Sequence, residues 1–314
     1  MVTDTVMPAL RARIAGGDFV VTAEITPPRG PDTDRLLREA DLLAQAVDAI
    51  NVTDGAGANV RMSSIAAAAI LKRAGYEPIV QATCRDRNRI ALQSDLIGAA
   101  ALGIDNVLVL TGDSVAAGDH PDATPVFDLD SRELLRALAA LRDDGVTLSG
   151  KPVSPRPAFL LGAADVCLDP DSPDWSAEPL LAKVRAGAGF IQSQYCFDAE
   201  RMRRHVGRLR DAGLPPEVPY LVGLGPLRSA RVALWMRDTL WGTVMPGELV
   251  RRMEQSGDPE ETGIDICAEL LAAAAATPGI DGAHLMAPGH QAGIVEAVRR
   301  SGAAQAAAES SARA

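Results

Sequence analysis

Two kinds of hydrophobic pattern alternate along this chain. Short continuous apolar runs, such as Val-Leu-Val-Leu within residues 106–110, are typical of strands that are buried on both faces. Longer segments between them carry apolar residues every three or four positions, as in residues 89–102, where Gly103 ends the pattern. A buried strand joined through a helix to the next buried strand is a parallel βαβ unit. The pattern therefore predicts a repeated strand–helix fold.

Eight strands and the helices between them are predicted from this pattern. The strands are residues 19–26, 49–53, a segment that ends at Thr83, 106–110, 158–164, 190–194, 220–224 and 282–286. The helices are residues 7–14, 32–45, 63–74, 89–102, 131–143, 178–186, 199–212, 228–240, 246–255, 261–276 and 291–300. Repeated right-handed crossovers of this kind close into a barrel, so we expect an α/β fold, a single-domain (β/α)8 TIM barrel. The alternative is an open doubly wound sheet, which is disfavoured because no Gly-x-Gly-x-x-Gly turn follows the first strand.

The expected domain organisation is simple. Residues 1–17 form an N-terminal arm with a short helix, residues 18–301 form the catalytic barrel, and residues 302–314 form a disordered tail of alanine and serine. The segment 114–129 is the longest loop in the first half of the chain. Loops of this length at the strand-end face of a barrel commonly build the site or its lid.

Composition narrows the classes of function. The chain has 314 residues, of which 47% are hydrophobic, and a net charge of −10, which argues against nonspecific nucleic-acid or anionic-membrane binding. Its four cysteines show no C-x-x-C spacing and its four histidines lie far apart, so we expect reduced thiols and no metal site. Without a signal-peptide core or a membrane-spanning apolar run, the protein is expected to be cytoplasmic.

Polar residues end the predicted strands, where a barrel gathers side chains into one mouth. They are Glu24, Thr53 with Asp54, Gln81 with Thr83, Asp113, Asp165, Gln194 and His284. Each could equally cap a helix or bind water. Glu24 stands out because apolar residues and two prolines surround it, and desolvation there would raise its pKa and suit a general acid.

Other candidates are weaker. The loop with Arg85, Arg87 and Arg89 could bind a carboxylate or phosphate, and a solvated face is as good an explanation. The glycine-rich segment 55–58 could let the backbone approach a ligand closely. His205 lies between arginines on a predicted helix, so solvation is expected for it.

Several of these strand ends carry motifs that resemble methylenetetrahydrofolate reductases. The segment AEITPPR at residues 23–29 resembles that family's E-x-x-P-P-R signature, and VTDGA at 52–56 resembles V-T-x-G-A. QATC at 81–84, LTGD at 110–113 and IQSQYCFD at 191–198 parallel H-L-T-C, L-R-G-D and A-I-T-Q-F-F-F-D. The match runs in order from about residue 19 to residue 300. Residues 84–108 and 118–131 look most like the branch of acetogenic bacteria and homocysteine methyltransferase fusions.

The resemblance implies a flavin-dependent reductase that converts 5,10-methylenetetrahydrofolate to 5-methyltetrahydrofolate, with FAD, or FMN as the alternative, and NAD(P)H as donor. Glu24 falls on the family's general acid, and Asp113 falls on the carboxylate near flavin and pterin. The implied cofactor-binding positions are Thr53, Thr111, Gly112, Ala164, Asp165 and Lys183. The implied folate-binding positions are Gln194, Gln81 and Thr83.

The sequence also departs from the family pattern. Thr111 stands where the family has a flavin-binding arginine, and Asp165 and Asp169 stand where it has a tyrosine and a histidine. The loss of a cation and the gain of carboxylates should weaken binding of a pyrophosphate. The alternative is therefore a folate-binding barrel without its own flavin that acts only within an electron-transfer complex. As partners we expect a folate, with a homo-oligomer or an accessory electron-transfer subunit as further alternatives.

Overall fold

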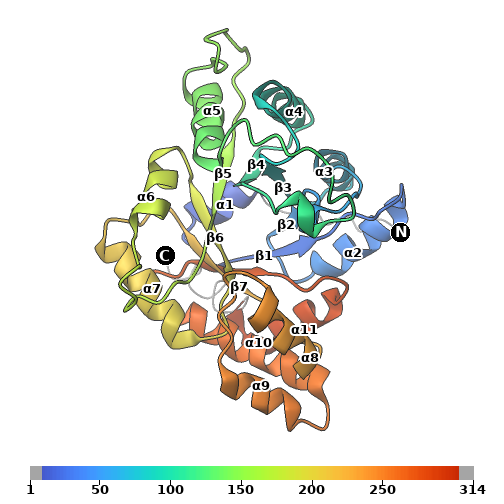
Figure 1. Ribbon diagram of the computed structural model, residues 1–314, viewed down its shortest axis with the longest axis vertical. Coiled ribbons are helices and arrows are strands. Elements are labelled where there is room, and N and C mark those ends of the chain that lie inside the picture. Colours follow the sequence, from blue (N-terminus) through green and yellow to red (C-terminus); the bar gives the residue numbers. More distant parts are fainter. Residues whose placement is uncertain (1–8, 304–314) are drawn as a thin grey trace.

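The buried apolar runs form a closed barrel of eight parallel strands, in which each strand pairs with the next along the chain. The computed structural model describes residues 9–303, and pairing of β1 with β8 closes the sheet. The strands are β1 (Val20–Ile25), β2 (Ala49–Val52), β3 (Pro78–Thr83), β4 (Asn106–Leu110), β5 (Leu160–Asp165), β6 (Phe190–Tyr195), β7 (Tyr220–Leu224) and β8 (Gly282–Leu285). The predicted (β/α)8 barrel is confirmed (Figure 1).

Helices surround the barrel and lie where the sequence pattern places them. They are α1 (Leu10–Ala15), α2 (Thr33–Leu43), α3 (Ser64–Arg73), α4 (Arg89–Ala101), α5 (Ser131–Asp143), α6 (Glu178–Arg185), α7 (Ala199–Asp211), α8 (Ala230–Thr239), α9 (Gly247–Glu254), α10 (Pro259–Ala275) and α11 (Gln291–Ser301). α10 begins earlier than the pattern predicts because Asp258 caps it, accepting a hydrogen bond from the backbone N–H of Glu261. The expected arm before residue 9 and the tail after residue 303 lie outside the described residues.

Two apolar layers hold the barrel together. The larger layer lies between the outer face of the sheet and the helices, and includes Val21, Ala163 and Val206. The smaller layer fills the amino-terminal end of the barrel interior; its members are Leu10, Val20, Ala49, Ile79, Leu108, Leu160, Phe190 and Leu221. Because Leu10 belongs to α1, this short helix closes the amino-terminal end, and the carboxyl end is left for chemistry.

The absence of a side chain at Gly162 leaves space inside the barrel for the ring of Phe190. A Cβ atom on Gly162 of β5 would lie 2.2 Å from the ring of Phe190 on β6. Alternating large and small residues on neighbouring strands is the usual way to fill a barrel interior. This bulky ring completes the apolar plug below the polar layer described next.

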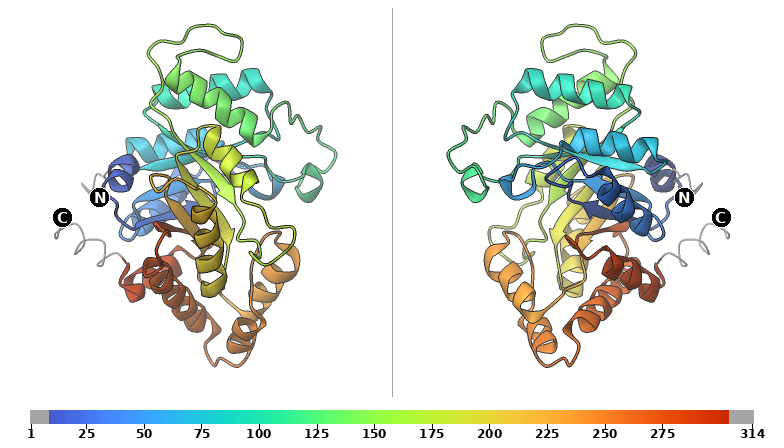
Figure 2. Two further views of the ribbon diagram at one scale, coloured as in Figure 1. Left: turned by 90° about the vertical axis from the view of Figure 1, so that its left-hand side faces the viewer. Right: turned by 90° about the vertical axis from the view of Figure 1, so that its right-hand side faces the viewer.

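The long loop between β4 and α5 packs against the body of the barrel. It lies against the turn that follows β2, and Figure 2 shows the two segments side by side at the edge of the barrel. The fit is close: a Cβ atom on Gly118 would lie 1.9 Å from the carbonyl oxygen of Ala58. The loop therefore covers the glycine-rich segment 55–58.

Candidate active site

Glu24 lies at the carboxyl end of β1 and shares the inward face of that strand with Val20 and Thr22. Its Oε2 accepts a hydrogen bond of 3.0 Å from Nε2 of Gln81 on β3. Burial raises the pKa of Glu24 to about 7; the hydrogen bond from Gln81 opposes that rise, and the Asp113 carboxylate adds to it. The structure thus brings together three predicted site residues, Glu24, Gln81 and Asp113.

A layer of buried polar side chains lies directly beneath Glu24. Oγ1 of Thr22 lies 3.0 Å from Nδ1 of His284 and accepts a 2.9 Å hydrogen bond from Nε2 of Gln192. Gln192 and Asn51 exchange two further hydrogen bonds across the barrel. Sequence reasoning found His284 and missed the other three; a polar residue at every second position of an apolar strand is the signal that could have found them.

Asp113 is exposed at the rim of the mouth. Its Oδ2 accepts a 2.9 Å hydrogen bond from the backbone N–H of Gly57, in the glycine-rich segment. Asp119 of the covering loop accepts from the backbone N–H of Val60 and pairs with Arg29 at 3.0 Å. The donors of this segment therefore bind carboxylates of the same chain.

Asp54 links the end of β2 to the end of β3, and its carboxylate is occupied by these contacts. Its Oδ2 accepts 2.9 Å hydrogen bonds from both the backbone N–H and the hydroxyl of Thr83, and it also pairs with Arg87. Thr83 was predicted to contact folate, but its hydroxyl donates its proton to Asp54. Oγ1 of the neighbouring Thr53 is buried without a hydrogen-bond partner among the described residues.

Asp165 is turned away from the mouth. It follows Ala163 on the outward face of β5, and its Oδ2 receives hydrogen bonds from Nε2 of His205 at 2.9 Å and from the Tyr220 hydroxyl at 2.7 Å. The expected solvation of His205 is wrong: the residue is 3% exposed, because α7 packs it against β5 and β7. Trp175 donates to its other ring nitrogen at 3.1 Å.

The remaining positions that the resemblance assigns are placed as follows. Nζ of Lys183 donates a 2.7 Å hydrogen bond to the carbonyl of Ala164, and burial lowers the pKa of Lys183. Oε1 of Gln194 accepts from the backbone N–H of Tyr195 at 2.9 Å. Thr111 is exposed, and Gly112 takes a φ of 97°, a left-handed conformation that favours glycine.

The basic loop after β3 is largely neutralised within the protein. Arg87 pairs with Asp54, and Arg89 pairs with Asp128 at 2.8 Å. Arg85 is buried, binds Asp86 at 2.7 Å and donates to the carbonyl of Gly55. These contacts favour a structural role over a carboxylate or phosphate site, and the burial of Arg85 also argues against the solvated face that was the alternative.

Several contacts oppose binding of the FAD diphosphate at the glycine-rich segment 55–58. The backbone N–H groups of Gly57 and Val60 bind Asp113 and Asp119. Arg29 and Arg85 pair with carboxylates, and Nη1 of Arg85 is buried without a hydrogen-bond partner among the described residues. Thr111 brings no charge to the position where the family has arginine. One expected obstacle is absent, however, because Asp165 and Asp169 bind His205 and Arg201 and not the mouth.

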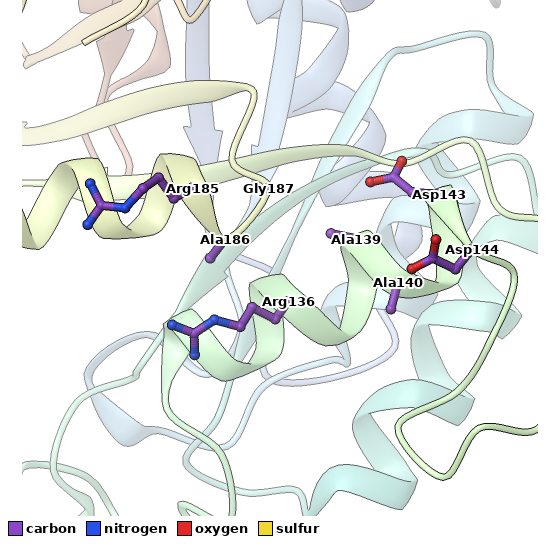
Figure 3. Close-up of a pocket in the computed structure, with 8 residues that line it drawn as sticks. All are labelled: Arg136, Ala139, Ala140, Asp143, Asp144, Arg185, Ala186 and Gly187. Atoms are coloured by element: carbon purple, nitrogen blue, oxygen red, sulfur yellow. The ribbon is translucent and has the colours of Figure 1, made fainter. Parts of the chain in front are cut away.

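A surface groove of about 240 Å³ lies elsewhere, between the carboxyl ends of α5 and α6 (Figure 3). Helix ends of this kind lie at the amino-terminal end of a barrel, opposite the mouth, so the groove does not belong to the candidate site.

Within residues 9–303, no group of histidine, cysteine or acidic side chains could hold a metal ion. No helix in the same range is long and apolar enough to cross a membrane.

Comparison with known proteins shows which family this chain matches. The sequence model of the methylenetetrahydrofolate reductase family matches residues 9–302. A probable methylenetetrahydrofolate reductase (NADPH) of Caenorhabditis elegans is 28% identical over 171 residues, which are 54% of this chain and 23% of that protein. Methylenetetrahydrofolate reductase 2 of Saccharomyces cerevisiae is 26% identical over 233 residues, 73% of this chain and 36% of the yeast protein.

A plant relative and a solved structure complete the comparison. Methylenetetrahydrofolate reductase (NADH) 1 of Arabidopsis thaliana is 24% identical over 269 residues, 82% of this chain and 44% of the relative. The chain thus spans less than half the length of each of these curated relatives. An uncharacterised protein of Clostridium thermocellum that binds two copies of 5-methyl-5,6,7,8-tetrahydrofolic acid shares the fold, with a TM-score of 0.64, 15% identity and coverage of 96% and 99% of the two chains.

Proposed function

The chain belongs to the methylenetetrahydrofolate reductase family, and we propose that it reduces 5,10-methylenetetrahydrofolate to 5-methyltetrahydrofolate in one-carbon metabolism. The donor that we propose is NADH or NADPH, the two nucleotides that appear in the names of its relatives. A barrel of this shape binds a folate in the Clostridium thermocellum protein, so the fold is compatible with such a ligand.

The observation that carries the proposal is the state of Glu24. A carboxyl group with a pKa of about 7 is protonated in a large fraction of molecules at neutral pH, and a general acid works best when its pKa lies near the working pH. Opening the five-membered ring of methylenetetrahydrofolate requires a proton on a ring nitrogen. We assign that proton to Glu24, whose Oε2 the amide of Gln81 holds at 3.0 Å.

Asp113 and the amides complete the proposed binding site. The exposed Asp113 carboxylate has hydrogen-bond acceptors that suit the amino and ring N–H groups of a pterin. Gln194, only partly buried at the end of β6, can offer its amide N–H₂ to a folate because its Oε1 already binds Tyr195. Gln81 stays with Glu24 and orients the acid, so its proposed contact with folate runs through that carboxyl group.

Two sources of hydride are compatible with this site. One is a flavin, FAD or FMN, bound at the mouth and reduced by NAD(P)H, with Thr53, Thr111, Gly112, Ala164 and Lys183 as the contacting positions. The other is a barrel that holds no flavin of its own and receives electrons within a complex. The contacts of Asp113 and Asp119 with the glycine-rich segment favour the second candidate.

The test uses the purified full chain. Its absorption spectrum is recorded first, because a bound flavin gives a yellow protein. The protein is then incubated with methylenetetrahydrofolate and either NADH or NADPH, with and without added FAD, and 5-methyltetrahydrofolate is measured by mass spectrometry. Product that depends on Glu24 supports the proposal. No product under any of these conditions, even with a cell extract that supplies accessory proteins, would overturn it.

The cellular location and the assembly of the enzyme are also proposed. We propose that it acts in the cytoplasm, and that it works as a homo-oligomer or with an accessory electron-transfer subunit. Purification from the native cell at low salt, followed by measurement of the mass of the complex, separates these two arrangements.

A further inference from the structure

His284 is a buried histidine of β8 that the proposed chemistry does not yet use. It is 3% exposed and lies inside the barrel, beneath the mouth. Its Nδ1 lies 3.0 Å from Oγ1 of Thr22, and its Nε2 lies 3.9 Å from Oε2 of Glu24. The imidazole therefore lies between the buried polar layer and the proposed acid, within hydrogen-bond distance of Thr22 but beyond that distance from Glu24.

The hydrogen bonds below His284 decide which ring nitrogen carries its proton. Nε2 of Gln192 donates to Oγ1 of Thr22 at 2.9 Å, while Oε1 of Gln192 accepts from Nδ2 of Asn51 at 2.7 Å. The Thr22 hydroxyl thus keeps its single proton for Nδ1 of His284. Because Nδ1 accepts, the proton of the neutral ring lies on Nε2, on the side of Glu24.

The ring is neutral over the working range of an enzyme. Burial lowers the pKa of His284 to about 3, so the imidazole offers Glu24 an N–H dipole and not a full positive charge. Such a dipole stabilises a carboxylate more than a neutral carboxyl group.

We propose that His284 is a positioning residue for Glu24, whose Nε2–H favours the carboxylate that remains after Glu24 has given its proton to the substrate. The Thr22, Gln192 and Asn51 side chains act by fixing that N–H in place. The role of Glu24 as the acid rests on the proposed function, whereas the contact of His284 with Glu24 does not.

Other groups also face Glu24 and have to be separated from His284. Gln81 of β3 donates to Oε2, and the Asp113 carboxylate after β4 raises the pKa of Glu24. Burial and the negative charge of Glu24 raise the pKa of Tyr195 of β6. The Tyr195 hydroxyl, however, donates to the carbonyl of Met286 at 2.7 Å. A variant at His284 leaves the partners of all three groups in place.

The test measures the titration of Glu24 directly. The full chain is labelled with [13C]glutamate at the side-chain carboxyl carbon, and the Glu24 signal is assigned by its loss in Glu24→Gln. Three variants are compared: His284→Phe removes both ring nitrogens, His284→Gln keeps an N–H donor near the position of Nε2, and Thr22→Val keeps the shape but frees the tautomer. His205→Phe is the matched control, because it removes another buried histidine with the same 3% exposure, which binds Asp165.

We expect the titration midpoint of Glu24 to rise in His284→Phe by less than about one pH unit, because the 3.9 Å between Nε2 and Oε2 is longer than a hydrogen bond. It should rise less in Thr22→Val, stay near that of the natural protein in His284→Gln, and not move in His205→Phe. If His284→Phe does not fold, the Thr22→Val titration decides. An unchanged midpoint in His284→Phe or Thr22→Val, or an equal rise in His205→Phe, overturns the proposal.

Activity then gives an independent readout. The alkaline limb of the pH profile for folate reduction should move with the Glu24 midpoint in each variant. If the protein reduces no methylenetetrahydrofolate, the proposed function fails, while the carboxyl titration still decides the role of His284.

Discussion

Gln81 on β3 donates a 3.0 Å hydrogen bond to Glu24 on β1, across a strand that pairs with both. The bond holds the proposed acid over the mouth of the barrel and stabilises its carboxylate form. Burial acts in the opposite direction and is the larger effect, so the pKa of Glu24 settles at about 7. This balance lets the group both give and regain a proton near neutral pH.

The Glu24→Gln substitution should remove the acid without removing the shape of the site. An amide still accepts the hydrogen bond from Gln81 but cannot donate the required proton as an acid. We expect the rate of methylenetetrahydrofolate reduction to fall by about 10²–10⁴-fold, while oxidation of the donor by an artificial acceptor stays near its natural rate. Steady-state assays of both reactions measure this.

The matched control for this prediction is Glu77→Gln, at the opposite end of the barrel. Glu77 accepts from the backbone N–H of Leu10 and pairs with Lys72 at 2.8 Å, so its loss should lower stability and spare activity. Near-natural folate reduction by the Glu24→Gln variant would remove Glu24 from the mechanism.

Stability should depend on pH through the same carboxyl group. Its folded pKa of about 7 lies above its ordinary value of 4.5, so the stability that it contributes is complete below 4.5 and is lost as the pH rises through 7. The loss is on the order of 3 kcal/mol at most. Urea unfolding should therefore show Glu24→Gln to be more stable than the natural protein at pH 8, with little difference at pH 4.5. Equal effects at both pH values would contradict the raised pKa.

The Asp113→Asn substitution should move the pH profile of folate reduction. The negative charge of Asp113 raises the pKa of Glu24, so its removal should shift the alkaline limb to lower pH. An asparagine oxygen can still accept from the backbone N–H of Gly57, so the loop should keep its place. If Asp113 served only to hold that loop, the profile would stay where it is and only the Tm would change.

Flavin affinity should be low and should depend on salt. The exposed carboxylates of Asp113 and Asp119 at the glycine-rich segment would repel a diphosphate, and physiological salt screens charges beyond about 8 Å. We expect FAD to bind more tightly at physiological than at low ionic strength, as measured by fluorescence titration. FMN has one phosphate and serves as the comparison. Tight FAD binding that ignores salt would show that these carboxylates leave the site free.

The covering loop should be sensitive at Gly118. A Cβ there would overlap the carbonyl oxygen of Ala58, so Gly118→Ala has to displace the loop from the glycine-rich segment. We expect faster proteolysis of the loop and altered folate binding. Gly207→Ala is the control: nothing lies within 4 Å of its added Cβ, and alanine in a helix should add about 1 kcal/mol of stability. Equal protease resistance of Gly118→Ala and the natural protein would argue against the contact.

The sequence alone determined the order of strands and helices and the placement of Glu24. Strand and helix periods are local properties, so residues 106–110 and 131–143 were predicted with the bounds that the structure shows. Glu24 could be found because a lone carboxylate among apolar residues and prolines signals desolvation wherever the strand lies. The barrel followed from repetition of one unit.

Only the tertiary structure decided which strand-end residues share the mouth. A continuous apolar run such as that of β5 carries no alternation, so nothing in it indicates that Asp165 faces the helices and binds His205. A shift of one residue in the strand turns a side chain to the opposite face. The contact of His284 with Thr22 likewise joins residues 262 positions apart along the chain. Such contacts depend on closure of the barrel, which sets the register between strands, and a local pattern does not encode that register.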